Sequence, residues 1–94
     1  MTVDAREASE TAFEIRRLRW QCRRGMLELD HVLDRFLDLG YGDLSPARRL
    51  AFVRLLAEQD QRLSDWFMSR AEPPDPDIRD LVRHIVEIVR EPSA

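Results

Sequence analysis

The residues best suited to specific binding chemistry stand in one short segment, Arg24-Gly25-Met26-Leu27-Glu28. A guanidinium is a planar fork of donors and a carboxylate is an acceptor, so Arg24 and Glu28 could together engage polar groups of another protein. A helix break at Gly25 would bring the two side chains beside each other at a corner. The alternative interpretation is an ion pair between them across the turn, which contributes little at a surface.

The side chains that could bind a metal or transfer a proton include two histidines and one cysteine. His31, Asp34 and Cys22 would offer too few ligands from one helix, and a surface histidine at a helix start is the favoured interpretation of His31. His84 falls among apolar residues of the last helical segment, where a partly buried and hydrogen-bonded histidine is expected. Neither histidine is assigned a role.

Arginines and a tryptophan are concentrated in residues 16–24. The segment Arg16–Arg24, with Trp20 inside it, could contact phosphates and stack on bases, so the alternative function is a small helical nucleic-acid-binding or antitoxin-like regulator. The net charge of -3 and the pI near 5.3 oppose binding to a polyanion. The favoured interpretation is a solvated face that the acidic residues of the second helix neutralise.

The sequence has no glycine-rich phosphate loop, no paired-cysteine metal spacing and no nucleophile elbow. We therefore expect a binding protein rather than an enzyme, with no catalytic residue, no metal and no cofactor of its own. Trp20 and Trp66 are the side chains that could stack on a flavin; Trp66 is expected in the core and Trp20 is the possible contact.

Five helical patterns must position these residues. Thr11 and Glu14 predict a capping box at the start of the first helix, which Gly25 ends. Residues 1–8 are expected to be a flexible N-terminal segment. The apolar face expected on this helix consists of Phe13, Leu18 and Cys22.

The second helix is predicted from apolar residues at helical spacing: Met26, Leu29, Leu33, Phe36 and Leu37. Gly40 and Gly42, on either side of Tyr41, end it. A third helix begins at Ser45-Pro46, and it is expected at the centre of the fold because residues 50–57 are apolar nearly all round.

Asp60 is the predicted cap of a short fourth helix that faces Leu63, Trp66 and Phe67 inward. A stiff proline-rich linker, residues 72–76, then leads to a fifth helix that begins at Asp75-Pro76. No segment alternates with a period of two. The predicted fold is therefore all-α, a compact single-domain five-helix bundle over residues 9–91.

Length and composition agree with one domain, because 94 residues with 44% hydrophobic content can bury one modest core. A single cysteine rules out an intrachain disulfide and suits a reducing compartment. No apolar run reaches the roughly 18 residues of a membrane span, and residues 1–14 are too acidic for a signal or transit peptide. We expect a soluble cytoplasmic protein.

Several segments, in order along the chain, resemble the SdhE family of succinate dehydrogenase assembly factors. Trp20 to Asp30 resembles the family's signature segment, and its RGxxE motif falls on Arg24, Gly25 and Glu28. The further similar segments are Tyr41 with Leu44, the segment 52–56, and the D-x-x-L-x-x-W pattern of Asp60, Leu63 and Trp66. The resemblance covers about residues 16 to 90. One departure lies in the turn after the fourth helix, where some relatives have a glycine and this chain has Ser69-Arg70-Ala71-Glu72.

The resemblance implies a chaperone-like assembly factor that binds the flavoprotein subunit of succinate dehydrogenase, or of fumarate reductase, and promotes flavinylation. FAD would then be the partner's cofactor, attached covalently to a histidine of that subunit. Protein–protein interaction would pass through Arg24, Gly25 and Glu28. The other residues expected to bind the partner are Arg23, Trp20 and Asp60.

Overall fold

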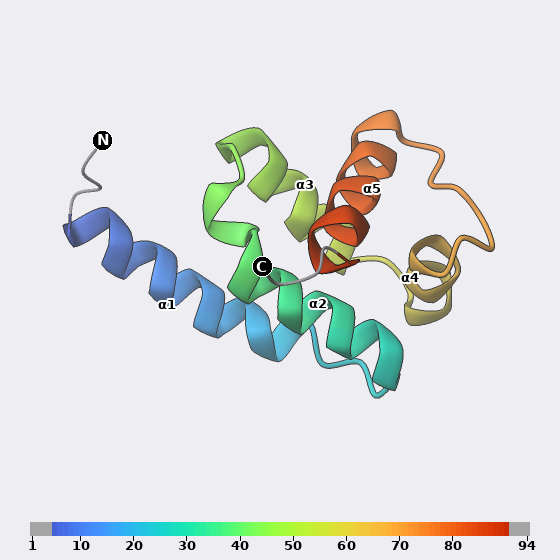
Figure 1. Cartoon of the computed structure of the whole chain (residues 1–94), viewed down its shortest axis with the longest axis horizontal. Coiled ribbons are helices and arrows are strands. Elements are labelled where there is room, and N and C mark those ends of the chain that lie inside the picture. The colour runs from blue at the N-terminus through green and yellow to red at the C-terminus, as the bar shows by residue number, and fades with distance from the viewer. Residues whose placement is uncertain (1–4, 91–94) are drawn as a thin grey trace.

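The computed structural model describes residues 5–90, with side-chain surroundings from residue 9 onward, and this part of the chain is helical without strands (Figure 1). The all-α, single-domain prediction is confirmed. The elements are α1 (Ala5–Gln21), α2 (Leu27–Leu39), the 3-10 helix η1 (Tyr41–Asp43), α3 (Pro46–Leu56), α4 (Asp60–Phe67) and α5 (Pro76–Arg90).

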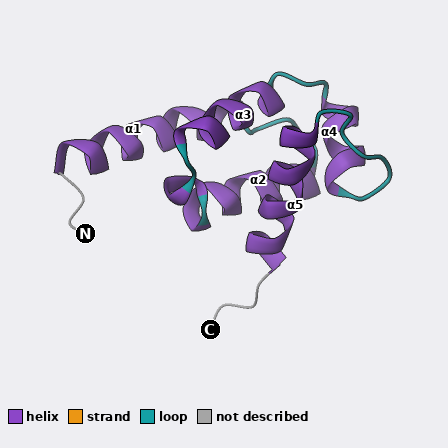
Figure 2. Cartoon of the chain, turned by 90° about the horizontal axis from the view of Figure 1, so that it is seen from above, coloured by secondary structure: helices purple, strands orange, loops and turns teal. Residues whose placement is uncertain are grey.

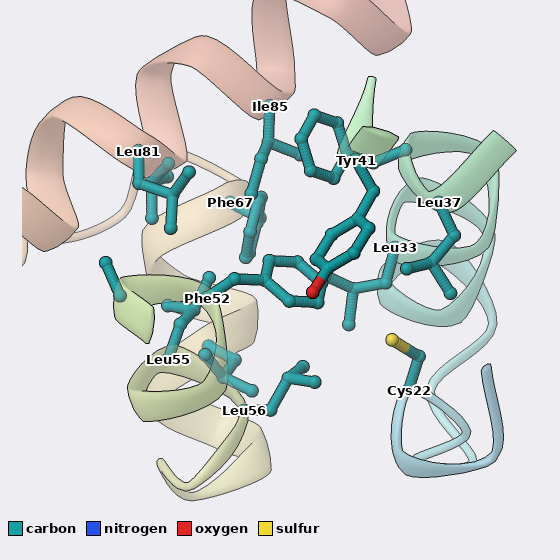
Figure 3. Close-up of a cluster of buried hydrophobic side chains, with 14 of the residues drawn as sticks. Cys22, Leu33, Leu37, Tyr41, Phe52, Leu55, Leu56, Phe67, Leu81 and Ile85 are labelled. Atoms are coloured by element: carbon teal, nitrogen blue, oxygen red, sulfur yellow. The ribbon is translucent and has the colours of Figure 1, made fainter. Parts of the chain in front are cut away.

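Helix α2 runs through the middle of the fold, and α5 packs on both α2 and α3. Helix α1 packs along α2 and extends beyond it, whereas α4 lies at the opposite end (Figures 1 and 2). The core lies between these elements. In Figure 3 the rings of Tyr41 and Phe52 lie at its centre, with 5.4 Å between their centroids.

The predicted apolar stripe of α2 is confirmed, because Leu29, Leu33, Phe36 and Leu37 are all buried. The helix ends at Leu39, and the following residue, Gly40, has no room for a side chain, because an added Cβ would lie 2.7 Å from Cε1 of Phe36. Close approach therefore requires a glycine here.

Two of the predicted helix starts are confirmed by their hydrogen bonds. The Ser45 hydroxyl accepts a bond from the Arg48 amide at 3.2 Å, with Pro46 at the first helical position. The Asp75 carboxylate accepts one from the Asp77 amide at 2.8 Å at the start of α5.

The predicted start of the first helix was wrong. Its predicted apolar face was right for Leu18 and Cys22, which are buried, and wrong for Phe13. Helix α1 begins at Ala5 and continues through Thr11, so Thr11 is no cap. Residues 5–8 of the segment expected to be flexible are helical, and residues 1–4 lie outside the described part. Phe13 is 66% exposed, because nine residues at about 100° each turn it to the side of the helix opposite Cys22. The boundaries 1–8 and 9–91 stay a prediction.

The third helix is not central, contrary to the expectation. Phe52 and Leu55 are fully buried, but Leu50 is 70% and Val53 47% exposed. Helix α3 packs on α5 through one face, so the apolar residues on its other face remain at the surface.

Candidate functional site

The chain turns between α1 and α2 in a loop that one carboxylate organises. The Asp30 Oδ1 atom accepts a hydrogen bond from the Arg24 amide at 2.9 Å, and Oδ2 accepts one from the Gly25 amide at 3.1 Å. Two successive amides that converge on an anion form a compact and well-defined backbone turn. Asp30 was not identified from the sequence; its only signal was an acidic residue near a helix start, which is common in proteins.

Gly25 occupies a backbone conformation that favours glycine. Its φ is +78°, in the left-handed region where a Cβ raises the energy, and an added Cβ would have no atom within 4 Å. The residue is exposed. The helix itself ends earlier than predicted, at Gln21, so Gly25 shapes the turn rather than the last helical residues.

The Arg24 side chain points into the molecule, toward the connection between α3 and α4. It is only 15% exposed, and Nη1 donates to Oδ1 of Asp60 at 3.0 Å. Nη1 also donates to the backbone carbonyl oxygen of residue 58, and Nε and Nη2 donate to those of residues 21 and 56. The sequence prediction that Arg24 and Glu28 present a joint patch is therefore wrong, because Arg24 already binds within its own chain.

Asp60 was predicted to cap α4, and this too was wrong. Gln59 occupies the cap position without a side-chain bond, and Asp60 is the first helical residue. Its carboxylate instead accepts a hydrogen bond from Arg24, which joins the turn to the start of α4. The ion pair between Arg24 and Asp60 thus holds the turn against the start of α4.

Other side chains around the turn are exposed to solvent, unlike that of Arg24. Trp20 is 69% exposed, and the Arg23 guanidinium lies 4.7 Å from its ring centroid. Leu27 is 86% exposed and Glu28 is exposed. We call Trp20, Arg23, Gly25, Leu27 and Glu28 the turn surface. It combines an aromatic ring, a cation, an aliphatic side chain and a carboxylate.

Three arginines of the basic segment interact with other residues of the chain. Arg19 binds both Asp34 and Asp38 of α2, the latter at 2.6 Å. Arg23 stacks on Trp20, and Arg24 points inward. The predicted pairing of these arginines with acidic residues of the second helix is thus confirmed for Arg19.

Cys22 and the histidines form no site in the described residues. The Cys22 thiol is buried, and burial raises its pKa to about 12, which disfavours the thiolate that a metal needs. Residues 5–90 hold no cluster of metal-ligating side chains. His84 is half-buried, with its ring edge-on to Phe36 at 6.1 Å. Within the same residues, no helix has the length and apolar character of a membrane span.

Fold and site together define a small helical protein that presents an ordered, exposed turn. The chain belongs to the family described as the flavinator of succinate dehydrogenase, which matches residues 16–89. The resemblance seen in the sequence is therefore confirmed.

Its relatives include proteins named FAD assembly factor SdhE. The protein from Shewanella oneidensis is 47% identical over 79% of this chain and 87% of its own length. The one from Pseudomonas aeruginosa is 45% identical over 88% and 96%, and the one from Idiomarina loihiensis 36% over 90% and 94%. These relatives carry the names of assembly factors rather than of enzymes.

Proposed function

We propose that this chain binds the flavoprotein subunit of succinate dehydrogenase, or of fumarate reductase, and promotes covalent attachment of FAD to that subunit. The family and the names of the relatives support an assembly factor for a flavin enzyme. The turn surface is the proposed contact. FAD is the partner's cofactor, and the reacting groups belong to the partner.

The observation that carries the proposal is the state of Gly25. It lies exposed and in a left-handed conformation, with open space where a side chain would be. Nothing inside the chain therefore requires the space beside it to be empty. A partner's surface that approaches the backbone closely at Gly25 would require that space. The exposed residues Trp20 and Glu28 precede and follow Gly25 along the chain.

Order in the turn favours binding. Asp30 holds two backbone amides and Arg24 holds the connection to α4, so the turn has little conformational freedom left to lose when a partner docks. Bound in this way, the chain would act by positioning: it would hold the flavoprotein in the arrangement in which its histidine and FAD react.

The test combines capture and flavin attachment. The purified flavoprotein subunit, free of covalent flavin, is incubated with FAD and with wild-type or variant chain, and covalent flavin is scored by in-gel fluorescence. Gly25→Arg should abolish capture and flavin attachment while the bundle stays folded by circular dichroism. The new side chain has no atom within 4 Å of its Cβ, and the left-handed strain of about 1–2 kcal/mol is smaller than the stability of a typical domain. Glu28→Ala should reduce both by removing an exposed acceptor.

Two matched controls are available in the same chain. Gly42 is also exposed, with open space beside it and no left-handed backbone, so Gly42→Arg should leave capture intact. Glu87 is exposed on α5, and Glu87→Ala matches Glu28→Ala. Capture by folded Gly25→Arg protein at wild-type strength, measured by calorimetry, would refute the proposed contact.

Separate experiments test whether the chain itself binds FAD or nucleic acid. The fluorescence of free FAD should not change on addition of this chain alone, since the flavin binds to the partner. Binding to duplex DNA that weakens steeply with salt, together with no capture of the flavoprotein, would instead favour the regulator based on the segment Arg16–Arg24.

A further inference from the structure

The solvent side of α1 carries a line of aromatic and basic side chains. Phe13 is 66% and Trp20 69% exposed, and Arg16 and Arg17 between them are exposed too. Successive helical residues are about 100° apart, so Trp20 lies within about 20° of Phe13 around the helix axis, and both arginines lie within about 60° of that line. We call Phe13, Arg16, Arg17 and Trp20 the α1 stripe.

Packing inside the chain does not explain the stripe. The buried residues of α1, Leu18 and Cys22, lie on the opposite side of the helix. Isolated exposed apolar residues are common, but two exposed rings on one line with charged neighbours are typical of an interaction surface. Phe13 also precedes residue 16, where the match to the family begins, so the family pattern does not explain this ring.

The arginines of the stripe are available to a partner. Within residues 9–90, neither Arg16 nor Arg17 forms an ion pair, whereas Arg19 binds two carboxylates of α2. The carboxylate of Glu14, on the same helix, is already bound to η1 and α3. The chain as a whole has a net charge of -3, so this cationic line is a local feature. Its complement is an acidic surface.

The stripe is continuous with the turn surface, because Trp20 belongs to both. The Arg23 guanidinium, also part of the turn surface, lies 4.7 Å from the Trp20 ring centroid. A partner that covers the turn surface covers Trp20, and Phe13 lies about 10 Å further along the axis of the same helix. In Figure 1, α1 continues past α2 in this direction. One partner can therefore contact both surfaces.

Two other classes of partner fit the stripe less well. A helix that lies on a membrane needs a broad apolar face, and the stripe offers two rings. A nucleic acid would be repelled by the net negative charge of the chain. A protein surface that has an apolar hollow and acidic side chains around it needs only an aromatic anchor and a few cations.

We propose that the α1 stripe is a second contact with the flavoprotein subunit. Phe13 inserts into an apolar hollow of that subunit, and Arg16 and Arg17 pair with acidic side chains around the hollow. This inference rests on the proposed function, because it assigns the stripe to the same partner as the turn surface. Helix α1 then extends the contact beyond the RGxxE motif.

Calorimetry of the full chain with the purified flavoprotein subunit tests the aromatic contact. Phe13→Ala should weaken binding about ten-fold, as the loss of one buried aromatic anchor commonly does. Leu50 is 70% exposed on α3, outside both surfaces, so Leu50→Ala is the matched control and should bind like the wild type. Circular dichroism verifies that both variants fold.

Association rates test the charges. The double variant Arg16→Glu, Arg17→Glu should slow association with the flavoprotein subunit at low salt, and its difference from the wild type should shrink as the salt concentration rises. Arg83 and Arg90 are exposed on α5. The double variant Arg83→Glu, Arg90→Glu changes the net charge equally and should slow association less.

The outcomes separate this inference from the proposed function. If the wild type is captured and Phe13→Ala binds equally well, the inference is overturned and the proposed function stands. If the wild type is not captured, the proposed function fails, and the inference fails with it. Binding of the chain to vesicles of anionic phospholipid or to duplex DNA that Phe13→Ala loses, with flavoprotein binding unchanged, would also overturn the inference and would assign the stripe to that ligand.

Discussion

At the scale of single residues, the two charged members of the RGxxE motif have different roles. Arg24 is a positioning residue that binds inside the chain, and Glu28 is exposed at the turn. Loss of function in variants of these residues would therefore have different causes. An Arg24 variant would lose the shape of the turn, whereas a Glu28 variant would, under the proposed function, lose a contact with the flavoprotein.

Stability measurements separate the two roles. Arg24→Ala should lower the free energy of unfolding by about 2–3 kcal/mol, because it removes charge-assisted bonds to Asp60 and to backbone carbonyls. Glu28→Ala should change it by less than about 0.5 kcal/mol, as is usual at exposed positions. Urea denaturation measures both. Equal stability of Arg24→Ala and wild type would show that the guanidinium does not anchor the turn.

At the scale of elements, hydrogen bonds between side chains that are far apart in the sequence connect α1 to the rest of the fold. The buried Tyr41 hydroxyl donates to Oε1 of Glu14, and the Arg49 guanidinium donates to Oε2 at 3.4 Å and to the Gly42 carbonyl oxygen at 2.9 Å. Helix α1 is thereby held to η1 and α3. Because the turn surface begins at the end of α1, this network also contributes to its position.

The end of α4 has a strained residue. Ser69 has a φ of +60°, and the amides of Ser69 and Arg70 bond back to the carbonyl oxygens of Trp66 and Asp65 at 3.4 and 2.8 Å. This is the Schellman arrangement, in which the left-handed position usually holds glycine. The turn in which this chain lacks the glycine of some relatives, residues 69–72, thus includes the left-handed residue.

Ser69→Gly should therefore stabilise the protein. Removal of the Cβ strain should outweigh the extra freedom of glycine in the unfolded chain, for a gain of about 0.5–1 kcal/mol and a rise in Tm of several degrees. Thermal and urea denaturation measure the gain. Ala71→Gly, in the same loop without the left-handed conformation, is the control and should be neutral or destabilising. A decrease in stability for Ser69→Gly would show that the serine side chain contributes more than the strain costs.

At the scale of the whole molecule, the core contains two groups that titrate at alkaline pH. Burial raises the pKa of Cys22 to about 12, and burial together with the bond to Glu14 raises the pKa of Tyr41. The chain has no lysine, one cysteine and one tyrosine. These two side chains therefore dominate the titration between about pH 9 and 12.

Stability should fall as the pH rises through this range. A group whose pKa is higher in the folded state binds its proton more tightly there, so its contribution is complete below the unfolded pKa and is lost as the pH rises toward the folded pKa. The free energy of unfolding should drop by up to about 1.4 kcal/mol per pH unit for each group. Urea titrations from about pH 8 to 11 measure the slope, which Cys22→Ala should reduce. A flat profile for the wild type would contradict the burial of both groups.

Local features of the fold could be predicted from the sequence because their causes lie within a few residues. The Ser45 cap before Pro46, the Asp75 cap before Pro76 and the glycine requirement at Gly25 all depend on short-range backbone chemistry. The apolar stripe of α2 and the all-helical class follow from periodicity alone. The RGxxE motif itself was also visible, and with it the family.

The tertiary structure decided what each of those residues does. Arg24 and Asp60 are 36 positions apart, so no local pattern could show that they bind each other and that Arg24 turns away from Glu28. The same holds for the exposure of Phe13, Leu50 and Val53, since an apolar residue is buried only where another element covers it. Spacing along a helix defines its faces, but only packing determines which of them meets the core.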